Sequence, residues 1–181
     1  MDVVAAPYLA AALLLVVAGV AKALDPLSLV RALRAAGLTV RAPLLVRFVR
    51  VAAVFEAAVG ALAIVSPSRT AALAVAASYA GFTLFVLQAL RTGSPLASCG
   101  CFGKADTPPT GLHVAVTGVL AVAAAGAALL PTHGGLAGEP GAGVPLLLSS
   151  AALAGVLSVA LAVQPRLVAA RRLFDRPAAR A

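Results

Sequence analysis

The sequence predicts an all-α integral membrane protein, a bundle of about five transmembrane helices with a short interfacial helix after the first span. Hydrophobic residues make up 62% of the 181 residues and charged residues 11%, whereas a soluble domain carries about a quarter charged residues. The apolar residues occur in runs of about twenty, which as helix cross a hydrocarbon core of about 30 Å. Nearly all prolines fall at the ends of those runs, where a helix can stop.

The predicted spans form one transmembrane domain over residues 1–165, followed by a basic tail at 166–181. The expected boundaries are 3–23, 44–65, 70–90, 111–130 and 144–163. Lys22 and Pro26 close the first span, since proline cannot donate the next helical hydrogen bond. No Lys or Arg precedes the first run. A cleavable signal peptide needs such a basic start, so we expect this run to remain as a span.

The segment 27–38 is too short and too charged to cross a membrane. Val30 and Leu33 lie on one helical face, and Arg31 and Arg34 lie on another. This pattern predicts an amphipathic helix at the membrane interface.

Small residues recur in the second span at the spacing of a helix-packing face. They are Ala53, Ala57, Gly60 and Ala61. Such residues let membrane helices approach closely, so we expect this face to contact another span.

Glu56 is an acidic residue deep inside a predicted span. It lies about 18 Å from Leu44 along a helix that rises 1.5 Å per residue. A carboxylate near the middle of the membrane is costly, and by default it indicates a functional site. Tyr79, in the third span, lies at nearly the same depth, so we expect a Glu56–Tyr79 hydrogen bond. Two roles stay open for it: an intramembrane proton relay, or a neutral packed carboxylic acid satisfied by the hydroxyl.

Both cysteines of the chain, Cys99 and Cys101, lie in the polar loop at 91–110, between the third and fourth spans. A disulfide between them would enclose almost no chain, so it would add little stability. A strained Cys-x-Cys disulfide is easily reduced, which suits a redox-exchange pair. Lys104 and His113 are candidates to stabilise a thiolate.

Two other roles remain open for the cysteine pair. Thiolates bind soft metals such as Cu(I) or Zn(II), and Cys99, Cys101 and His113 would then be the ligands. Alternatively, the cysteines are reduced thiols in a glycine-rich turn, and the bundle is a non-enzymatic scaffold or transport helper.

The distribution of Lys and Arg predicts the orientation. The segment between the first two spans, the cysteine loop and the tail are basic, whereas the opposite side has Arg69 alone. Loops rich in Lys and Arg stay in the cytoplasm. We therefore expect a plasma-membrane protein with its N-terminus outside and its C-terminus and cysteine loop inside. The basic residues that give the net charge of +8 flank apolar spans. We therefore expect the bilayer, and no nucleic acid, as a partner.

Several of these stretches resemble one family. Residues 19–26 (GVAKALDP) are similar to the G-x-x-K-x-x-D-P signature of the methylamine-utilisation protein MauE and its DoxX-like relatives. Glu56, the block 99–103 (CGCFG) and Asp106 shortly after it are also similar to that family. The resemblance covers roughly residues 5–130.

The resemblance implies a four-helix DoxX-like core, here with one additional C-terminal span. It also implies a role in the maturation of the disulfide-rich small subunit of methylamine dehydrogenase, beside a thioredoxin-like partner, MauD. Cys99 and Cys101 would then exchange disulfides with such a partner or with a secreted disulfide-containing client, as part of a thiol–disulfide oxidoreductase.

Cysteines on one side cannot carry electrons across the membrane, so a second carrier is needed. Glu56 and Tyr79 would relay protons or shape the site of a quinone-like acceptor. Thr117 departs from the family, in which an asparagine is expected.

Overall fold

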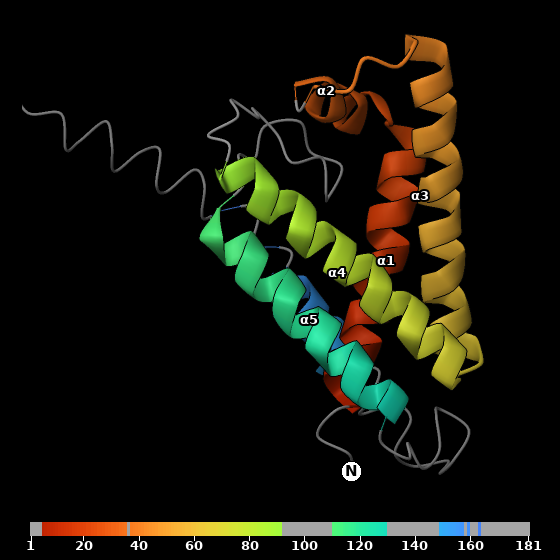
Figure 1. Ribbon diagram of the computed structural model, residues 1–181. Helices are drawn as coiled ribbons and strands as arrows, with labels where there is room; N and C mark the ends of the chain where they lie inside the picture. Colours follow the sequence, from red (N-terminus) through yellow and green to blue (C-terminus); the bar gives the residue numbers. More distant parts are fainter. Residues whose placement is uncertain are drawn as a thin grey trace, which may run out of the picture.

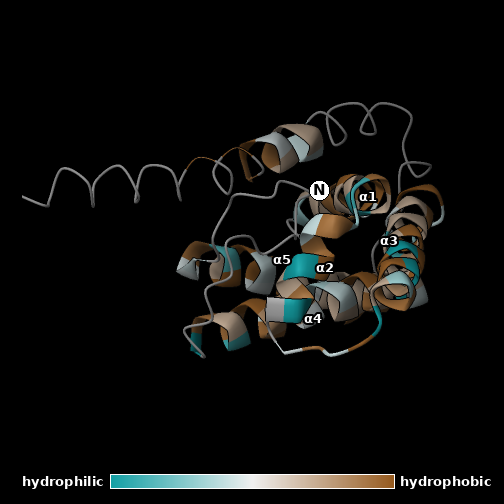
Figure 2. Cartoon of the chain, turned by 90° about the horizontal axis from the view of Figure 1, so that it is seen from above, coloured by the Kyte–Doolittle hydropathy of each residue, from teal (hydrophilic) through white to brown (hydrophobic). Residues whose placement is uncertain are grey.

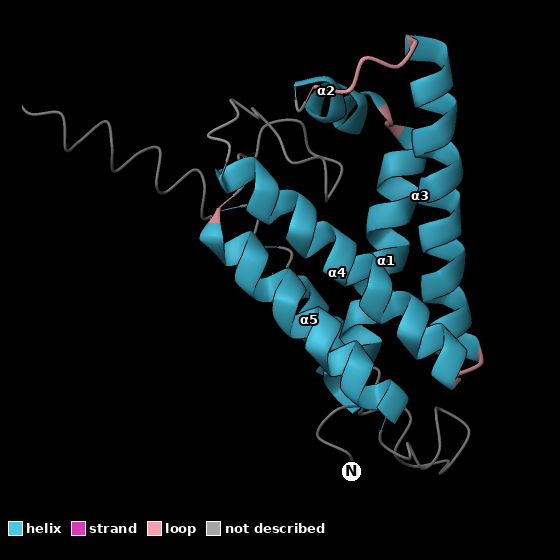
Figure 3. Ribbon diagram, in the orientation of Figure 1, coloured by secondary structure: helices cyan, strands magenta, loops and turns pink. Residues whose placement is uncertain are grey.

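The computed structural model describes residues 5–35, 37–91, 110–129 and 149–157, together with residues 159 and 163. Its helices are α1 (Ala5–Leu24), α2 (Leu27–Ala35), α3 (Ala42–Val65), α4 (Arg69–Arg91) and α5 (Gly111–Leu129). Residues 149–157 are helical as well. Over these described ranges the chain contains helices and short connections and no strand (Figure 3).

Four of these helices are long and apolar enough to cross a membrane. They are α1, α3, α4 and α5, with 20, 24, 23 and 19 residues. Their ends lie within one or two residues of the expected boundaries. The prediction of an all-α membrane bundle is confirmed. Of the fifth span predicted at 144–163, the structure describes mainly the helical stretch 149–157. The tail at 166–181 lies outside the described residues.

The spans pack as two antiparallel pairs, α1 with α3 and α4 with α5 (Figures 1 and 2). α1 is the most enclosed span and carries much of the core. Leu14 and Leu15 of α1 pack in one cluster with Val75 of α4 and Leu120 of α5. Ala154 of the stretch 149–157 belongs to the same cluster. The two pairs therefore meet around α1.

Glycines allow α1 and α3 to touch backbone to backbone. A Cβ on Gly19 would lie 2.6 Å from the Ala57 nitrogen and 2.7 Å from the Ala53 carbonyl oxygen. A Cβ on Gly60 would lie 2.7 Å from a carbonyl oxygen of α1. The packing face predicted on the second span is thus confirmed at three of its positions, whereas Ala61 is exposed.

The short helix α2 lies at the end of the bundle where α1 finishes and α3 begins (Figure 1). Asp25 Oδ1 accepts a hydrogen bond of 3.2 Å from the Leu27 nitrogen at its start. It ends earlier than the expected residue 38 because Gly37 turns the chain at a positive φ of 97°, which glycine adopts without steric cost. Val30 of α2 packs on Leu45 of α3.

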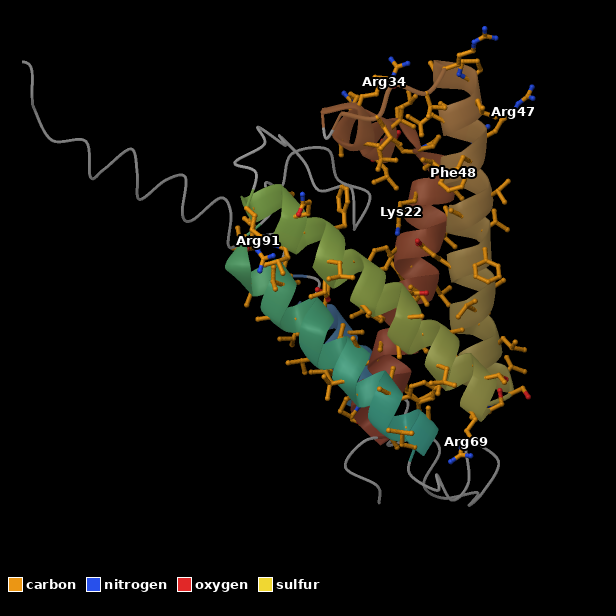
Figure 4. The ribbon with its side chains drawn as sticks, viewed as in Figure 1. Lys22, Arg34, Arg47, Phe48, Arg69 and Arg91 are labelled. Atoms are coloured by element: carbon orange, nitrogen blue, oxygen red, sulfur yellow. The ribbon has the colours of Figure 1, made fainter. Side chains whose placement is uncertain are left out.

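A second contact joins α2 to the other pair of spans. Ala32 of α2 packs with Ala89 in the last turn of α4. α2 therefore contacts both α3 and α4. The cysteine loop runs from the end of α4 to the start of α5. Arg91, at the end of α4, and the start of α5 lie on this α2 side of the bundle, whereas Arg69 lies at the opposite end (Figure 4).

Candidate functional site

A buried charge pair joins α1 to α3. Lys22 Nζ and Glu56 Oε2 form a salt bridge, with the Lys22 side chain 1% exposed and that of Glu56 17% exposed. The antiparallel packing brings them together, because Gly19, one turn before Lys22, touches Ala57, the neighbour of Glu56. An ionisable pair inside membrane spans is a functional-site candidate.

α4 supplies an aromatic wall beside this pair. Lys22 Nζ lies 4.2 Å from the centroid of the Phe82 ring, within the range of a cation–π contact. Phe82 in turn meets Tyr79 edge to face, with ring centroids 5.9 Å apart. The charge pair thus holds three spans together: α1, α3 and α4.

The prediction of a hydrogen bond between Glu56 and Tyr79 is wrong. The Tyr79 hydroxyl donates to the Ala11 carbonyl oxygen at 2.8 Å, and Glu56 pairs with Lys22. The physical reason is that an ammonium group makes a stronger, charge-assisted bond to a carboxylate than a neutral phenol does. Glu56 and Tyr79 are nevertheless neighbours of one cluster, linked through Lys22 and Phe82.

Lys22 is a candidate to which we assigned no functional role from the sequence, although it is the lysine of the G-x-x-K-x-x-D-P signature at residues 19–26. We expected it to close the first span, but its side chain is buried in the bundle. Side chains of a helix lean toward its N-terminus, so a lysine near the end of α1 can reach back into the interior. Two signals were available: that signature, and Glu56 itself, since a carboxylate inside the membrane needs a cation as partner.

A second polar cluster lies between α4 and α5. The Thr83 hydroxyl lies 2.9 Å from the Thr117 hydroxyl, and Thr117 donates to the His113 carbonyl oxygen at 2.7 Å. Hydroxyl side chains satisfy one another in this way at membrane helix contacts. Thr117, which departs from the asparagine expected in the family, thus has a packing role between α4 and α5.

His113 is buried in the first turn of α5, with an exposed fraction of 1%. Its Nδ1 is hydrogen-bonded to Thr110 Oγ1 at 2.9 Å. Thr110 is the residue at which the cysteine loop joins α5. The imidazole is therefore held in one position directly at the end of that loop.

The other predicted site residues, Cys99, Cys101 and Lys104, lie outside the described residues. Their roles stay predictions, and so does the alternative metal site formed with His113. Among the residues that the structure does describe, no three His, Cys, Asp or Glu side chains gather closely enough to hold a metal ion.

Four apolar spans around a buried charge pair define the chain as a multi-pass, all-helical membrane protein. The family model described as methylamine utilisation protein MauE matches residues 2–131. This match covers well over half of the 181 residues, and the chain belongs to the MauE family. Searches of curated proteins and of solved structures found no match.

Proposed function

We propose that this protein exchanges disulfides through Cys99 and Cys101 and thereby supports the maturation of a partner protein. The observation that carries the proposal is the place of His113. Its imidazole is buried and oriented by Thr110, where the cysteine loop meets α5. A neighbouring histidine can take the proton of a thiol and raise the thiolate fraction, and the thiolate is the reactive form.

The proposed reaction is a two-step exchange. The thiolate of one cysteine attacks a disulfide of the partner, forming a mixed disulfide and releasing one partner thiolate. The second cysteine attacks the mixed disulfide, which releases the second partner thiolate and leaves a Cys99–Cys101 disulfide. The partner gains two electrons and the protein loses two. The same steps in reverse oxidise a partner dithiol.

The chemistry of the partner follows from this reaction. It carries a reactive dithiol or disulfide, as in a thioredoxin-like protein or a secreted client. Continued turnover needs a second electron carrier, and a lipid-soluble quinone is the class that we propose. The cluster around Glu56 does not fit a quinone ring, because Lys22 covers a face of Phe82 and Tyr79 packs edge to face with the same ring. We therefore route no step through that cluster.

The buried charge pair favours a second candidate function. Lys22 and Glu56 fix α1 to α3, which is a structural role that needs no thiol chemistry. A non-enzymatic scaffold or transport helper for a partner would use such a rigid bundle, and in that case the cysteines are incidental or bind metal.

The proposal is tested with the variants Cys99→Ser, Cys101→Ser and the double variant. On non-reducing gels, one single variant should accumulate a mixed disulfide with the partner, and the double variant should accumulate none. Full partner maturation in the double variant would exclude thiol exchange and favour the scaffold. One copper or zinc ion bound per chain, and lost in the double variant, would favour metal handling.

His113→Gln tests whether the His113 imidazole activates a cysteine thiol. It should slow formation of the mixed disulfide about tenfold, the change in thiolate fraction when a thiol pKa rises by about one unit. Thr83→Val is the matched control, because it removes a half-buried polar group of the same α4–α5 contact without removing an imidazole.

A further inference from the structure

Five exposed arginines surround the end of the bundle at α2. We call them the basic collar: Arg31, Arg34, Arg41, Arg47 and Arg50. Two lie on α2, one precedes α3, and two lie in the first turns of α3. Figure 4 shows Arg34 and Arg47 at this end, with their side chains directed away from the helices.

The described part of the chain offers the collar no carboxylate partner. Its acidic residues are Asp25 and Glu56. Glu56 is paired with Lys22, and Asp25 Oδ1 accepts the Leu27 nitrogen at the start of α2. One collar residue, Arg31, uses its Nε on the Leu27 carbonyl oxygen at 3.2 Å. Within the described ranges no carboxylate therefore neutralises the guanidinium charges of the collar, which makes an external anion a suitable partner.

Packing holds the collar in place. Val30 on the inner side of α2 packs against Leu45 and Val49 of α3, and Ala32 packs with Ala89 of α4. The charged side of α2 is therefore fixed relative to the first turns of α3. A preorganised set of guanidinium groups loses less entropy on binding than a mobile one.

Exposed apolar residues lie next to the collar and indicate its environment. They are Leu24, Leu27, Leu44 and Phe48. Apolar and basic residues side by side are typical of a segment at the bilayer surface, where the apolar groups enter the acyl chains and the cations lie at headgroup level. The anion present there at high density is the phospholipid phosphate, which guanidinium binds in bidentate geometry.

We propose that the basic collar binds the headgroups of anionic phospholipids and keeps α2 on the membrane surface. The opposite end of the bundle lacks this feature within the described ranges, since its arginine, Arg69, donates from Nε to the Ala128 carbonyl oxygen at 2.9 Å. The binding is therefore expected in one leaflet only. It does not depend on the proposed thiol chemistry.

The experiment uses the purified full chain in phosphatidylcholine vesicles that contain trace spin-labelled phosphatidylglycerol or phosphatidylcholine. The motionally restricted fraction of each label measures its association with the protein. The wild type should prefer phosphatidylglycerol, and 1 M salt, which shortens the screening length to about 3 Å, should remove most of that preference. A variant with all five collar arginines changed to Gln should lose at least about fivefold in preference, the effect expected of one basic residue at an anionic surface.

The matched control changes the same five arginines to Lys, which keeps the charge and should keep most of the preference. The variant Arg31→Gln, Arg34→Gln should lose part of it, and circular dichroism verifies that each variant is helical. Equal restriction of the two lipids by the wild type would overturn the proposal, as would an unchanged preference in the five-Gln variant.

Discussion

At the scale of single residues, the Lys22–Glu56 pair lies within membrane-spanning helices, where the free-energy cost of a charge is highest. The lysine is 1% exposed, and its ammonium contacts both a carboxylate and the Phe82 ring. A buried ion pair repays its desolvation only when its geometry is good, and removing one partner leaves the other charge unpaired. Single and double substitutions of the pair should therefore differ in how much stability they remove.

Lys22→Met should lower the free energy of unfolding by about 3 kcal/mol, because Glu56 then stays half-buried inside the bundle without a counterion. The double variant Lys22→Met, Glu56→Gln should recover most of that loss, since neither charge remains. Thermal unfolding of the purified protein in mild detergent measures both. A Lys22→Met protein as stable as the wild type would show that the salt bridge contributes nothing to the fold.

The double variant also separates structure from function. If it is stable and still supports its partner, the pair has a structural role only. If it is stable but inactive, the charges themselves take part in the function.

At the scale of elements, close approach of backbones determines how α1 and α3 pack. A Cβ added to Gly19 would lie 2.6 Å from a backbone nitrogen of α3, and backbone atoms of a helix cannot move aside as the tip of a side chain can. Membrane helices gain much of their association from such close packing. The close packing of α1 on α3 thus depends on the absence of a Cβ at Gly19.

Gly19→Ala should destabilise the bundle by about 1–3 kcal/mol through overpacking, as measured by thermal unfolding. Gly81→Ala is the matched control, because a Cβ there meets no atom within 4 Å. In the middle of α4 it should stabilise by about 0.5–1 kcal/mol through helix propensity. Equal effects of the two substitutions would contradict the close contact.

At the scale of the whole molecule, the basic residues divide the protein into two unlike ends. The collar and both ends of the cysteine loop lie on the α2 side, and Arg69 lies at the other end (Figure 4). Loops rich in Lys and Arg remain in the cytoplasm. The cysteine loop should therefore face the cytoplasm.

A membrane-impermeant thiol reagent should label Cys99 and Cys101 only after cells are permeabilised. The control is Ser66→Cys in a chain with both native cysteines changed to Ser. It lies in the exposed α3–α4 turn at the opposite end and should be labelled in intact cells. Labelling of the native pair in intact cells after reduction would reverse this orientation and would favour oxidative maturation outside the cell.

Composition and local pattern were sufficient to predict the four described spans, the short helix α2 and the position of Glu56 inside a span. These features depend on neighbouring residues in the chain: run length decides whether a helix can span, and proline and glycine decide where it ends. The small-residue packing face of α3 was also predicted, from the spacing of its residues alone. The helix that packs against this face, α1, was not predicted.

Only the tertiary structure showed which groups meet. Glu56 pairs with Lys22 and not with Tyr79, Gly19 touches the backbone of α3, and α2 reaches α4 through Ala32. These contacts depend on how far one helix is shifted along another and on how each is rotated. Hydropathy constrains neither quantity when every span is apolar on all sides, because lipid and protein interior are then equally good surroundings for most of its surface.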